Sequence, residues 1–457
     1  MVLTMRHVAE IEHPWREPAD VLGGQAETPW SLGLLSGGGG PRGRWSYVMG
    51  APGAVLEVWP AGAGGAFDAL RGLNQAGDII DGGAPFQGGV AGLAAYGLGI
   101  AAQGLDLPAD PDWPVLACAY YPAVLAFDHE RRRVLAYGRG ATDVEARERA
   151  AEAVARLSRA QPQAELRPPA VELRPADARA YEAAVAEVTE RIAAGEIFQA
   201  NIARLWTGQA SAHVAPFDLV LALRRASSAP FAAYLRLAGR ALVSNSPERF
   251  ISVRPRAGAL SAETRPIKGT RPRGQDAVSD AALAAELQES LKDRAENLMI
   301  VDLMRNDLSR VCRPGTVRAP ELFALESFAN VHHLVSTVTG ELSPGQDAVD
   351  LLEAAFPPGS ITGAPKIQAM KVIAELEPPR GPYCGSIFWL GADGAFDSSV
   401  LIRTACFVEA AEGWRVEARA GAGIVADSQP QAERAETEAK IAALVAAMTS
   451  GLARGAA

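Results

Sequence analysis

One basic segment in the second half of the chain has the composition of an anion-binding loop. The segment Glu263–Gly274 reads ETRPIKGTRPRG and places Gly269 and Thr270 among cationic side chains. The cations in and before this segment are Arg256, Arg265, Lys268, Arg271 and Arg273. A glycine lets backbone N–H groups approach a carboxylate, and a threonine adds a hydroxyl donor. The pattern predicts an anion site, although a solvated basic loop would have the same composition.

Carboxylates that could donate a proton or hold a metal lie in three further segments. Glu248 lies in SNSPERF, at a connection between expected strands, and Glu296 lies on an expected helix. Glu433 and Glu436, three residues apart on a later helix, share one face and repel each other unless a cation lies between them. Mg²⁺ prefers hard oxygen ligands, so this pair with Glu296 predicts a magnesium site. Alternatively, Lys440 offsets Glu436, and the other carboxylates are solvated.

The spacing of apolar residues predicts the strands and helices that carry these side chains. Expected strands are Ala54–Trp59, Leu116–Ala119, Ala123–Phe127, Arg133–Tyr137, Glu196–Trp206, Ala232–Leu237, Ala241–Ser244, Phe250–Val253, Leu334–Gly340, Gly385–Leu390, Ser399–Phe407 and Trp414–Ala420. Expected helices cover residues 140–158, Asp177 (the N-cap) to about Gly195, Ala281–Leu308, and a stretch from about Gln431. Strict βα alternation is missing, which indicates an α+β fold rather than a Rossmann-type sheet.

The length and one proline-rich stretch predict two lobes. A chain of 457 residues exceeds what one hydrophobic core usually supports. The stretch Arg159–Asp177 contains four prolines and little periodicity, so we expect it to be a linker. The predicted division is an N-terminal lobe over residues 1–160 and a catalytic lobe over residues 177–450.

Composition excludes several classes of function. The net charge of −9 argues against general binding to nucleic acid or to an anionic membrane. The four cysteines, Cys118, Cys312, Cys384 and Cys406, form no CxxC pair, so neither a zinc site nor a disulfide scaffold is indicated. The N-terminal residues MVLTMRHVAEIEHPW carry early charges and no long apolar run, unlike a signal peptide or a membrane anchor. We expect a cytoplasmic enzyme.

Read together, these motifs resemble the chorismate-utilising enzymes, which include anthranilate, aminodeoxychorismate, isochorismate and salicylate synthases. The resemblance spans about Tyr181–Leu444 and includes GEIFQANIAR, SPERF, RPIKGTRPRG, KDRAENLMIVDLMRNDL, VHHLVSTVTG, PPGSITGAPK and GAGIVADSQPQAE, in the family's order. Weaker matches in the first part are RWSYVMGAP and PFQGGVAGLAAYGLG. The resemblance implies an α+β sandwich of two sheets with helices outside and a cleft between them.

The resemblance also assigns roles to individual residues. Glu248 matches the general acid, and Glu296, Glu433 and Glu436 match the Mg²⁺ carboxylates. Positions that bind substrate carboxylates, shape the pocket or lie near the ring correspond to Gly269, Thr270, His333, Thr362, Tyr383, Arg403, Gly421 and Gly423. A weaker match to the family's tryptophan pocket involves Ser36, Arg44, Trp45, Ser46 and Tyr47; ordinary strand and turn residues are the alternative.

Lys268 distinguishes the branches of this family. The PIKGT motif is typical of the aminodeoxychorismate synthases, whereas anthranilate synthases usually have alanine at the lysine position. In the isochorismate-type enzymes a lysine at the position of Gln199 activates water, and glutamine cannot act as that base. The expected product is therefore 4-amino-4-deoxychorismate, on the way to 4-aminobenzoate and folate. Lys268 is expected to be the nucleophile, or otherwise to pair with a substrate carboxylate.

The resemblance also implies partners. The chain shows no glutaminase constellation, so ammonia is expected from a separate glutamine amidotransferase subunit. Removal of pyruvate is expected to need a separate aminodeoxychorismate lyase. Two alternatives stay open: an anthranilate synthase component I, and a non-catalytic scaffold that binds an amidotransferase or chorismate. The presence of Glu248, Glu296, Glu433 and Glu436 argues against the scaffold.

Overall fold

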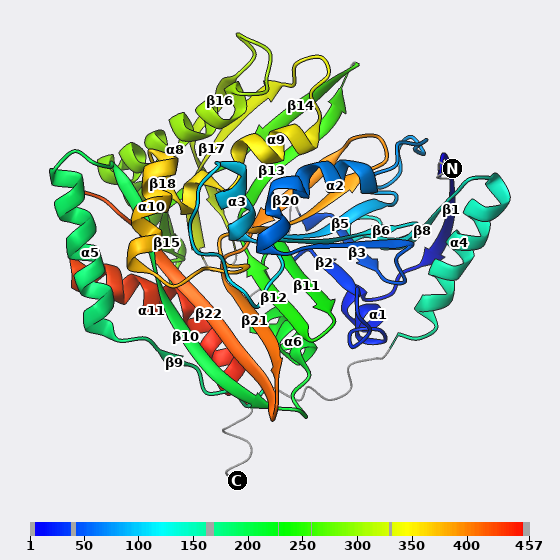
Figure 1. Ribbon diagram of the computed structural model, residues 1–457, viewed down its shortest axis with the longest axis horizontal. Coiled ribbons are helices and arrows are strands. Elements are labelled where there is room, and N and C mark those ends of the chain that lie inside the picture. The colour runs from blue at the N-terminus through cyan, green and yellow to red at the C-terminus, as the bar shows by residue number, and fades with distance from the viewer. Residues whose placement is uncertain are drawn as a thin grey trace.

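The computed structural model describes residues 5–37, 43–160, 169–226, 228–256, 258–328 and 331–450. Residues 161–168 of the expected linker lie outside these ranges. The described strands form two large antiparallel sheets (Figure 1). Most expected strands are confirmed, with bounds that differ by a few residues.

The first sheet contains twelve strands among the described residues. Its order is β1 (His7–Pro14), β8 (Arg133–Gly140), β7 (Ala123–Asp128), β3 (Trp45–Met49), β2 (Leu32–Leu35), β11 (Phe231–Leu237), β12 (Arg240–Ser246), β21 (Thr404–Ala410), β22 (Gly413–Ile424), β10 (Gln199–Ser211) and β18 (Gly363–Ala364). The two-residue β9 (Arg174–Pro175) pairs with β10.

The second sheet contains ten strands among the described residues. Its order is β15 (Ile267–Pro272), β17 (Val331–Glu341), β14 (Ala259–Thr264), β13 (Arg249–Arg256), β20 (Phe396–Val400), β19 (Ser386–Gly391), β5 (Gly89–Ala94), β6 (Leu116–Tyr121) and β4 (Ala54–Val58). The remaining strand, β16 (Arg318–Ser327), pairs with β17.

A buried apolar cluster lies between the two sheets. It contains Tyr47 and Leu235 from the first sheet, and Leu93 and Trp389 from the second. Side chains that alternate along each strand reach this layer, and burial of their apolar surface drives the sheets together. The fold is therefore the expected α+β two-sheet sandwich.

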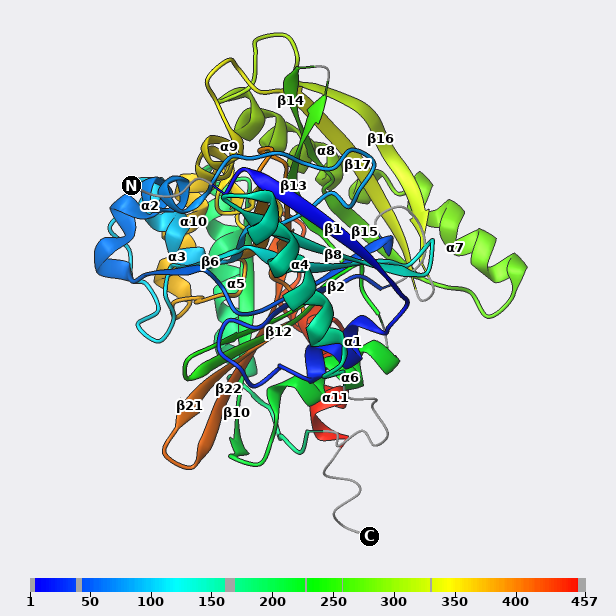
Figure 2. The same ribbon diagram turned by 90° about the vertical axis from the view of Figure 1, so that its right-hand side faces the viewer.

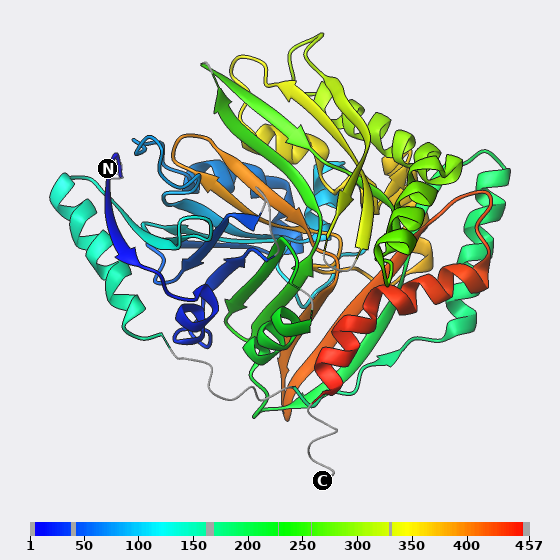
Figure 3. The ribbon, with the colours of Figure 1, turned by 180° about the vertical axis from the view of Figure 1, so that it is seen from behind.

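Helices cover the outer faces of the sandwich. They are α1 (Pro18–Gly23), α2 (Ala66–Leu73), α3 (Tyr96–Ala102), α4 (Asp143–Leu157), α5 (Ala178–Ala193), α6 (Pro216–Ala226), α7 (Ala277–Glu289), α8 (Leu291–Ser309), α9 (Ala348–Ala355), α10 (Lys366–Leu376) and α11 (Pro430–Thr449), with short 3₁₀ turns η2 (Pro60–Gly65) and η3 (Gly359–Ile361). Helices α4 and α5 lie at opposite ends of the molecule (Figure 1). Figure 2 shows α4 across β8 and β1, and Figure 3 shows α11 along β22.

Both sheets combine strands from the two sides of the expected linker. In the first sheet β2 pairs with β11, and in the second β5 pairs with β19. The predicted boundary between residues 160 and 177 therefore does not separate one sheet from the other.

Two expected elements are each interrupted, and both predictions were wrong in this respect. The helix expected over Ala281–Leu308 is two helices, because Ser290 has ψ of 108° and its side chain accepts a hydrogen bond from the Asp293 N–H as the N-cap of α8. The strand expected over Ser399–Phe407 is β20 and β21, because Arg403 between them has a left-handed φ of 54°. Both breaks place side chains in the cavity described below.

No helix within the described ranges is long and apolar enough to cross a membrane.

Candidate active site

All but one of the predicted catalytic, substrate-binding and metal-binding residues line a single cavity of about 730 Å³. The connection from β12 to β13 contributes Glu248, and β15 contributes Lys268, Gly269 and Thr270. The other lining residues from the prediction are Glu296 on α8, His333 on β17, Gly421 and Gly423 on β22, Glu433 and Glu436 on α11, and Tyr383 and Arg403 on connecting segments. The cavity thus combines elements of both sheets.

Lys268 is partly buried in the wall of this cavity. Burial lowers the pKa of its ammonium group, and the positive charge of Lys440 acts in the same direction, against the charges of Glu296 and Glu248. A Cβ atom at Gly423 on β22 would lie only 3.0 Å from Lys268 Nζ. Glycine at this position therefore leaves room for the amine, and the surroundings favour its neutral, nucleophilic form.

Glu248 is 6% exposed and lines the same cavity. Burial raises its pKa to about 7, although a hydrogen bond from Ser360 and the charges of Lys268 and Lys440 oppose the increase. The hydroxyl of Ser360 donates to Glu248 Oε1 at 2.8 Å. A carboxyl group with this pKa is suited to donate a proton near neutral pH.

In the basic segment Glu263–Gly274, most of the cationic side chains form ion pairs with nearby carboxylates. Described ion pairs engage Arg265 with Glu326, Arg271 with Asp293 and Glu286, and Arg273 with Asp280. Among the described ion pairs none includes Lys268. Gly269 has φ of 85°, and a Cβ atom there would lie 2.9 Å from Leu287. Thr270 Oγ1 lies 2.9 Å from His333 Nδ1, which orients both polar side chains at the cavity.

The three predicted metal carboxylates face the cavity from two helices. Burial raises the pKa of Glu296 and of Glu433, and the charge of Glu436 adds to both increases. Burial also acts to raise the pKa of Glu436, but the 2.6 Å ion pair with Lys440 and the charges of Lys268 and Lys292 together leave the pKa lowered. Mutual repulsion of this kind is relieved by a cation.

The donor chemistry of these carboxylates suits Mg²⁺. Within the described residues no three His, Cys, Asp or Glu side chains are close enough together to form a complete metal site. Glu433 accepts a hydrogen bond from Ser428 at 2.7 Å, and Glu296 lies 3.9 Å from Lys292. Mg²⁺ usually keeps water ligands and binds few protein carboxylates, so an open set of this kind fits the ion. The magnesium site stays a prediction.

Arg403 and Tyr383 enter the cavity from connecting segments. The left-handed φ of Arg403 is unusual for a residue with a side chain and indicates that its surroundings hold this conformation. Tyr383 is buried, and the guanidinium group of Arg380 lies 5.8 Å from its ring centroid. A phenol and a guanidinium group suit recognition of an anionic ring compound.

Thr362 is the predicted residue that does not line the cavity. It is fully buried, and its hydroxyl donates to the Pro358 carbonyl at 2.8 Å. The Asn201 N–H donates to the Thr362 carbonyl at 2.8 Å. Thr362 therefore supports the turn around η3 from behind.

The sequence reasoning missed several lining residues, chiefly Ser360, Arg419, Lys292 and Asn201. Arg419 precedes Gly421 by two positions on β22, and strand periodicity places both on one face, so this residue could have been inferred. Ser360 lies 112 residues from Glu248 along the chain, and no local pattern indicates that contact.

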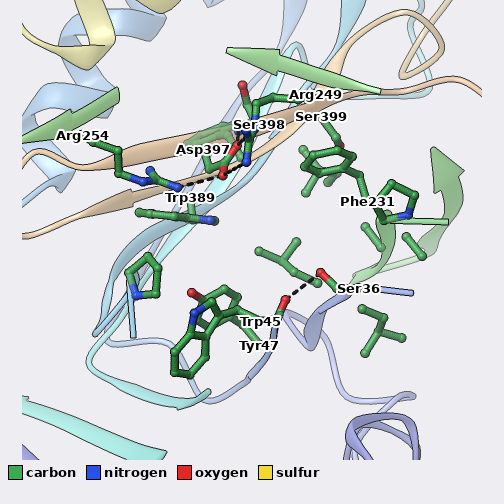
Figure 4. Close-up of a pocket in the computed structure, with 18 residues that line it drawn as sticks. Ser36, Trp45, Tyr47, Phe231, Arg249, Arg254, Trp389, Asp397, Ser398 and Ser399 are labelled. Atoms are coloured by element: carbon green, nitrogen blue, oxygen red, sulfur yellow. Dashed lines mark hydrogen bonds and ion pairs between the residues drawn. The ribbon is translucent and has the colours of Figure 1, made fainter. Parts of the chain in front are cut away.

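A second pocket, of about 150 Å³, lies where the tryptophan pocket was expected. Its lining includes Ser36, Trp45 and Tyr47 from the prediction (Figure 4). Opposite them lie Trp389 and an ion-pair group in which Asp397 binds Arg249 and Arg254, both at 2.9 Å. Aromatic faces beside paired charges suit a small zwitterion.

Two residues of the predicted tryptophan pocket lie away from it. Arg44 pairs with Asp128 at 2.9 Å. Ser46 Oγ accepts from the Ser36 N–H at 3.0 Å and lies 2.8 Å from His129 Nε2. They support the strand that presents Trp45 and Tyr47. Binding of tryptophan stays a prediction.

Comparison with known proteins identifies the family. The sequence model of one protein family, described as "chorismate binding enzyme", matches residues 63–446. This match covers more than half of the chain, and the chain therefore belongs to the chorismate binding enzyme family.

Curated relatives represent two activities within that family. The aminodeoxychorismate synthase component 1 of Klebsiella aerogenes is 44% identical over 367 residues, which cover 78% of this chain and 76% of that protein. The anthranilate synthase component 1 of Streptomyces coelicolor is 40% identical over 426 residues, which cover 89% of this chain and 81% of that protein. Identity at these levels does not separate the two activities.

Solved structures show the same fold. The anthranilate synthase component I of Streptococcus pneumoniae superposes with a TM-score of 0.75 at 26% identity, over 88% of this chain and 92% of that one. The menaquinone-specific isochorismate synthase MenF of Escherichia coli gives a TM-score of 0.70 at 19% identity, over 97% of this chain and 95% of that one.

Proposed function

We propose that the chain converts chorismate and ammonia to 4-amino-4-deoxychorismate. The observation that carries this proposal is Lys268, whose pKa is lowered, in the same cavity as Glu248, whose pKa is raised to about 7. Opposite shifts of this kind prepare one group as a nucleophile and the other as an acid. Direct attack by water has less support. The position at which isochorismate-type enzymes have a water-activating lysine is Gln199 here, and an amide cannot act as that base.

The proposed first step uses both groups. The Lys268 amine attacks C2 of the chorismate ring, the double bond moves, and the C4–O bond breaks. Glu248 donates its proton to the departing oxygen, which leaves as water, because hydroxide is a poor leaving group. The result is a covalent adduct and an ionised Glu248.

In the second step, ammonia enters the ring and the bond to Lys268 breaks. Ammonia attacks C4, the double bond moves back, and the C2–N bond to Lys268 breaks. The proton lost by the new amine returns to Glu248, and Lys268 is released as the free amine. Two steps replace one difficult displacement.

We propose that Glu296, Glu433 and Glu436 hold Mg²⁺ at this cavity. When bound there, Mg²⁺ would withdraw electrons from the ring carboxylate of chorismate. Arg403, Thr270 and the Gly269 backbone are proposed to orient the substrate carboxylates. His333 is proposed to support Thr270.

The proposed source of ammonia is a separate glutamine amidotransferase subunit. Both curated relatives described above are named component 1, which supports a two-component enzyme. The product keeps its pyruvyl group in this proposal, so a separate lyase would form 4-aminobenzoate. This would place the chain in folate synthesis.

The second candidate function is that of an anthranilate synthase component. The relatives of that name, such as the one from Streptomyces coelicolor, support it by similar identity and wider coverage. Anthranilate synthases eliminate pyruvate as well as aminating the ring, so the two functions differ in their product.

Product analysis tests the proposal. The purified chain is incubated with chorismate, MgCl₂ and ammonium chloride at mildly alkaline pH, and the products are separated by mass. We expect aminodeoxychorismate to accumulate and to become 4-aminobenzoate after an aminodeoxychorismate lyase is added. Anthranilate formed without a lyase would establish the second candidate, and unchanged chorismate would contradict both.

A further inference from the structure

A buried hydroxyl contacts the proposed acid. Ser360 and Glu248 are each 6% exposed, and Ser360 Oγ donates to Glu248 Oε1 at 2.8 Å. The described hydrogen bonds to this side-chain carboxyl group involve Oε1 and not Oε2. Because an oxygen that accepts a donated hydrogen is a poor place for the acid proton, the contact distinguishes the two oxygens.

The turn that carries Ser360 is held by several hydrogen bonds. The Thr362 hydroxyl donates to Pro358, and the Asn201 N–H on β10 donates to the Thr362 carbonyl. The buried Arg380 donates to the Ile361 carbonyl at 3.3 Å. These bonds fix the backbone on both sides of Ser360.

The same turn is also fixed by packing and a buried ion pair. A Cβ atom at Gly359 would lie 2.6 Å from Leu303 and Met304 on α8, so the backbone lies directly against that helix. After the turn, the Lys366 ammonium donates to Asp307 Oδ2 at 2.7 Å. The Ser360 hydroxyl is therefore held at a fixed place relative to Glu248.

We propose that Ser360 is a positioning residue for Glu248: its hydroxyl hydrogen occupies Oε1 and keeps the acid proton on Oε2. This assignment rests on the function proposed above. Oε2 then donates the proton to the departing oxygen of the substrate, and the negative charge that appears on the carboxylate is stabilised by the bond from Ser360 to Oε1.

The proposal predicts a direction for the proton affinity of Glu248. Its charged neighbours are Lys268 on β15 and Lys440 on α11, and both stay in place when Ser360 is changed. Loss of the hydroxyl removes a donor to the carboxylate, so Ser360→Ala raises the proton affinity of Glu248 by about tenfold.

The test is an infrared titration of the wild-type protein and four variants. The carbonyl band of protonated Glu248 is the band that Glu248→Gln removes. In Ser360→Ala its midpoint should move to higher pH, whereas Ser360→Thr, which keeps the hydroxyl, should restore the wild-type midpoint. Ser398→Ala is the matched control, because it removes another buried serine hydroxyl, one that donates to Ile251. Its midpoint should equal that of the wild type.

Turnover provides the second measurement. Ser360→Ala should lower kcat by about 10- to 100-fold with little change in KM. The alkaline limb of its profile of kcat/KM against pH should move with the infrared midpoint. An unchanged infrared midpoint in a folded Ser360→Ala protein would overturn the assignment, as would a Ser398→Ala shift of equal size. The titration needs no substrate, so it is independent of which product the enzyme makes.

Discussion

At the scale of single residues, Glu248 and Lys268 have opposite requirements. In the proposed reaction, Glu248 must carry its proton as the acid and Lys268 must have lost one as the nucleophile. Burial shifts both pKa values toward those states, raising that of Glu248 to about 7 and lowering that of Lys268. Because the groups interact, a pH profile reports the pair rather than either group alone.

The first prediction concerns the pH dependence of kcat/KM. The protonated fraction of Glu248 falls as pH rises through about 7, so the profile should have an alkaline limb near that pH. Glu248→Gln should remove this limb and lower kcat by about 10²- to 10⁴-fold. Glu190→Gln, at an exposed position on α5, is the control. Persistence of the limb in Glu248→Gln would assign it to another group.

The second prediction is that Glu248 destabilises the folded protein at high pH. Its folded pKa of about 7 exceeds the ordinary 4.5, so between these values the folded state binds more protons and stability falls as pH rises. Glu248→Gln should remove a cost of about 3 kcal/mol at pH 8. Urea unfolding of both proteins at pH 5 and pH 8 measures the difference. An equal pH dependence in the two proteins would contradict the prediction.

The same scale shows which site residues a sequence can reveal. Short segments of a composition unusual for buried structure contain Lys268, Glu248 and the acidic pair on α11. These segments occur in the order typical of the family that the chain resembles, which pointed to these residues. Ser360 and Arg419 act through contacts between distant segments. Thr362 shares a motif with Ser360 but points away from the cavity, because only the fold decides which side of a turn faces the substrate.

At the scale of helices and strands, the sequence predicted most elements, but the prediction missed two interruptions. Asp177 was correctly expected as an N-cap, and its side chain accepts from the Arg179 N–H at 2.9 Å. Ser290 makes the equivalent contact in the middle of the expected long helix. The sequence SLKD at Ser290–Asp293 has the serine and acidic residue of a helix N-terminus at the usual spacing, a local signal that the expected single helix did not take into account.

The third prediction uses these two caps as a matched pair. Ser290→Ala and Asp177→Ala should each lower the free energy of unfolding by about 1 kcal/mol, because each removes a cap. Ser290 lines the cavity and starts the helix that carries Glu296. Only Ser290→Ala should therefore raise the Mg²⁺ concentration needed for half-maximal activity. An equal Mg²⁺ requirement in both variants would contradict a role for the start of α8 at the proposed metal site.

At the scale of the whole molecule, the two-sheet sandwich could be predicted, but the pairing of strands from distant parts of the chain could not. The pairings of β2 with β11 and of β5 with β19 join segments about 200 and 300 residues apart. A hydrophobic pattern and a connecting turn set the register of neighbouring strands, but these distant pairs share no turn, so the sequence does not indicate which strands pair. The proline-rich stretch around residues 159–177 predicted a linker, yet strands on both sides of it share each sheet.

The fourth prediction follows from this shared architecture. Unfolding the N-terminal strands would expose the edges of β11 and β19, so both halves should unfold together. Urea unfolding followed by tryptophan fluorescence and by far-UV circular dichroism should give one coincident transition. Two separated transitions would indicate lobes that unfold independently.

The central claim is that Lys268 directs chorismate to 4-amino-4-deoxychorismate, and the most direct test compares products of wild type and Lys268→Ala in one assay with ammonium and Mg²⁺. The wild type should form aminodeoxychorismate, and Lys268→Ala should form it at least about 10²-fold more slowly because the nucleophile is lost. Lys371→Ala, at an exposed lysine on α10, should match the wild type. Anthranilate from the wild type, or normal aminodeoxychorismate formation by Lys268→Ala, would contradict the account.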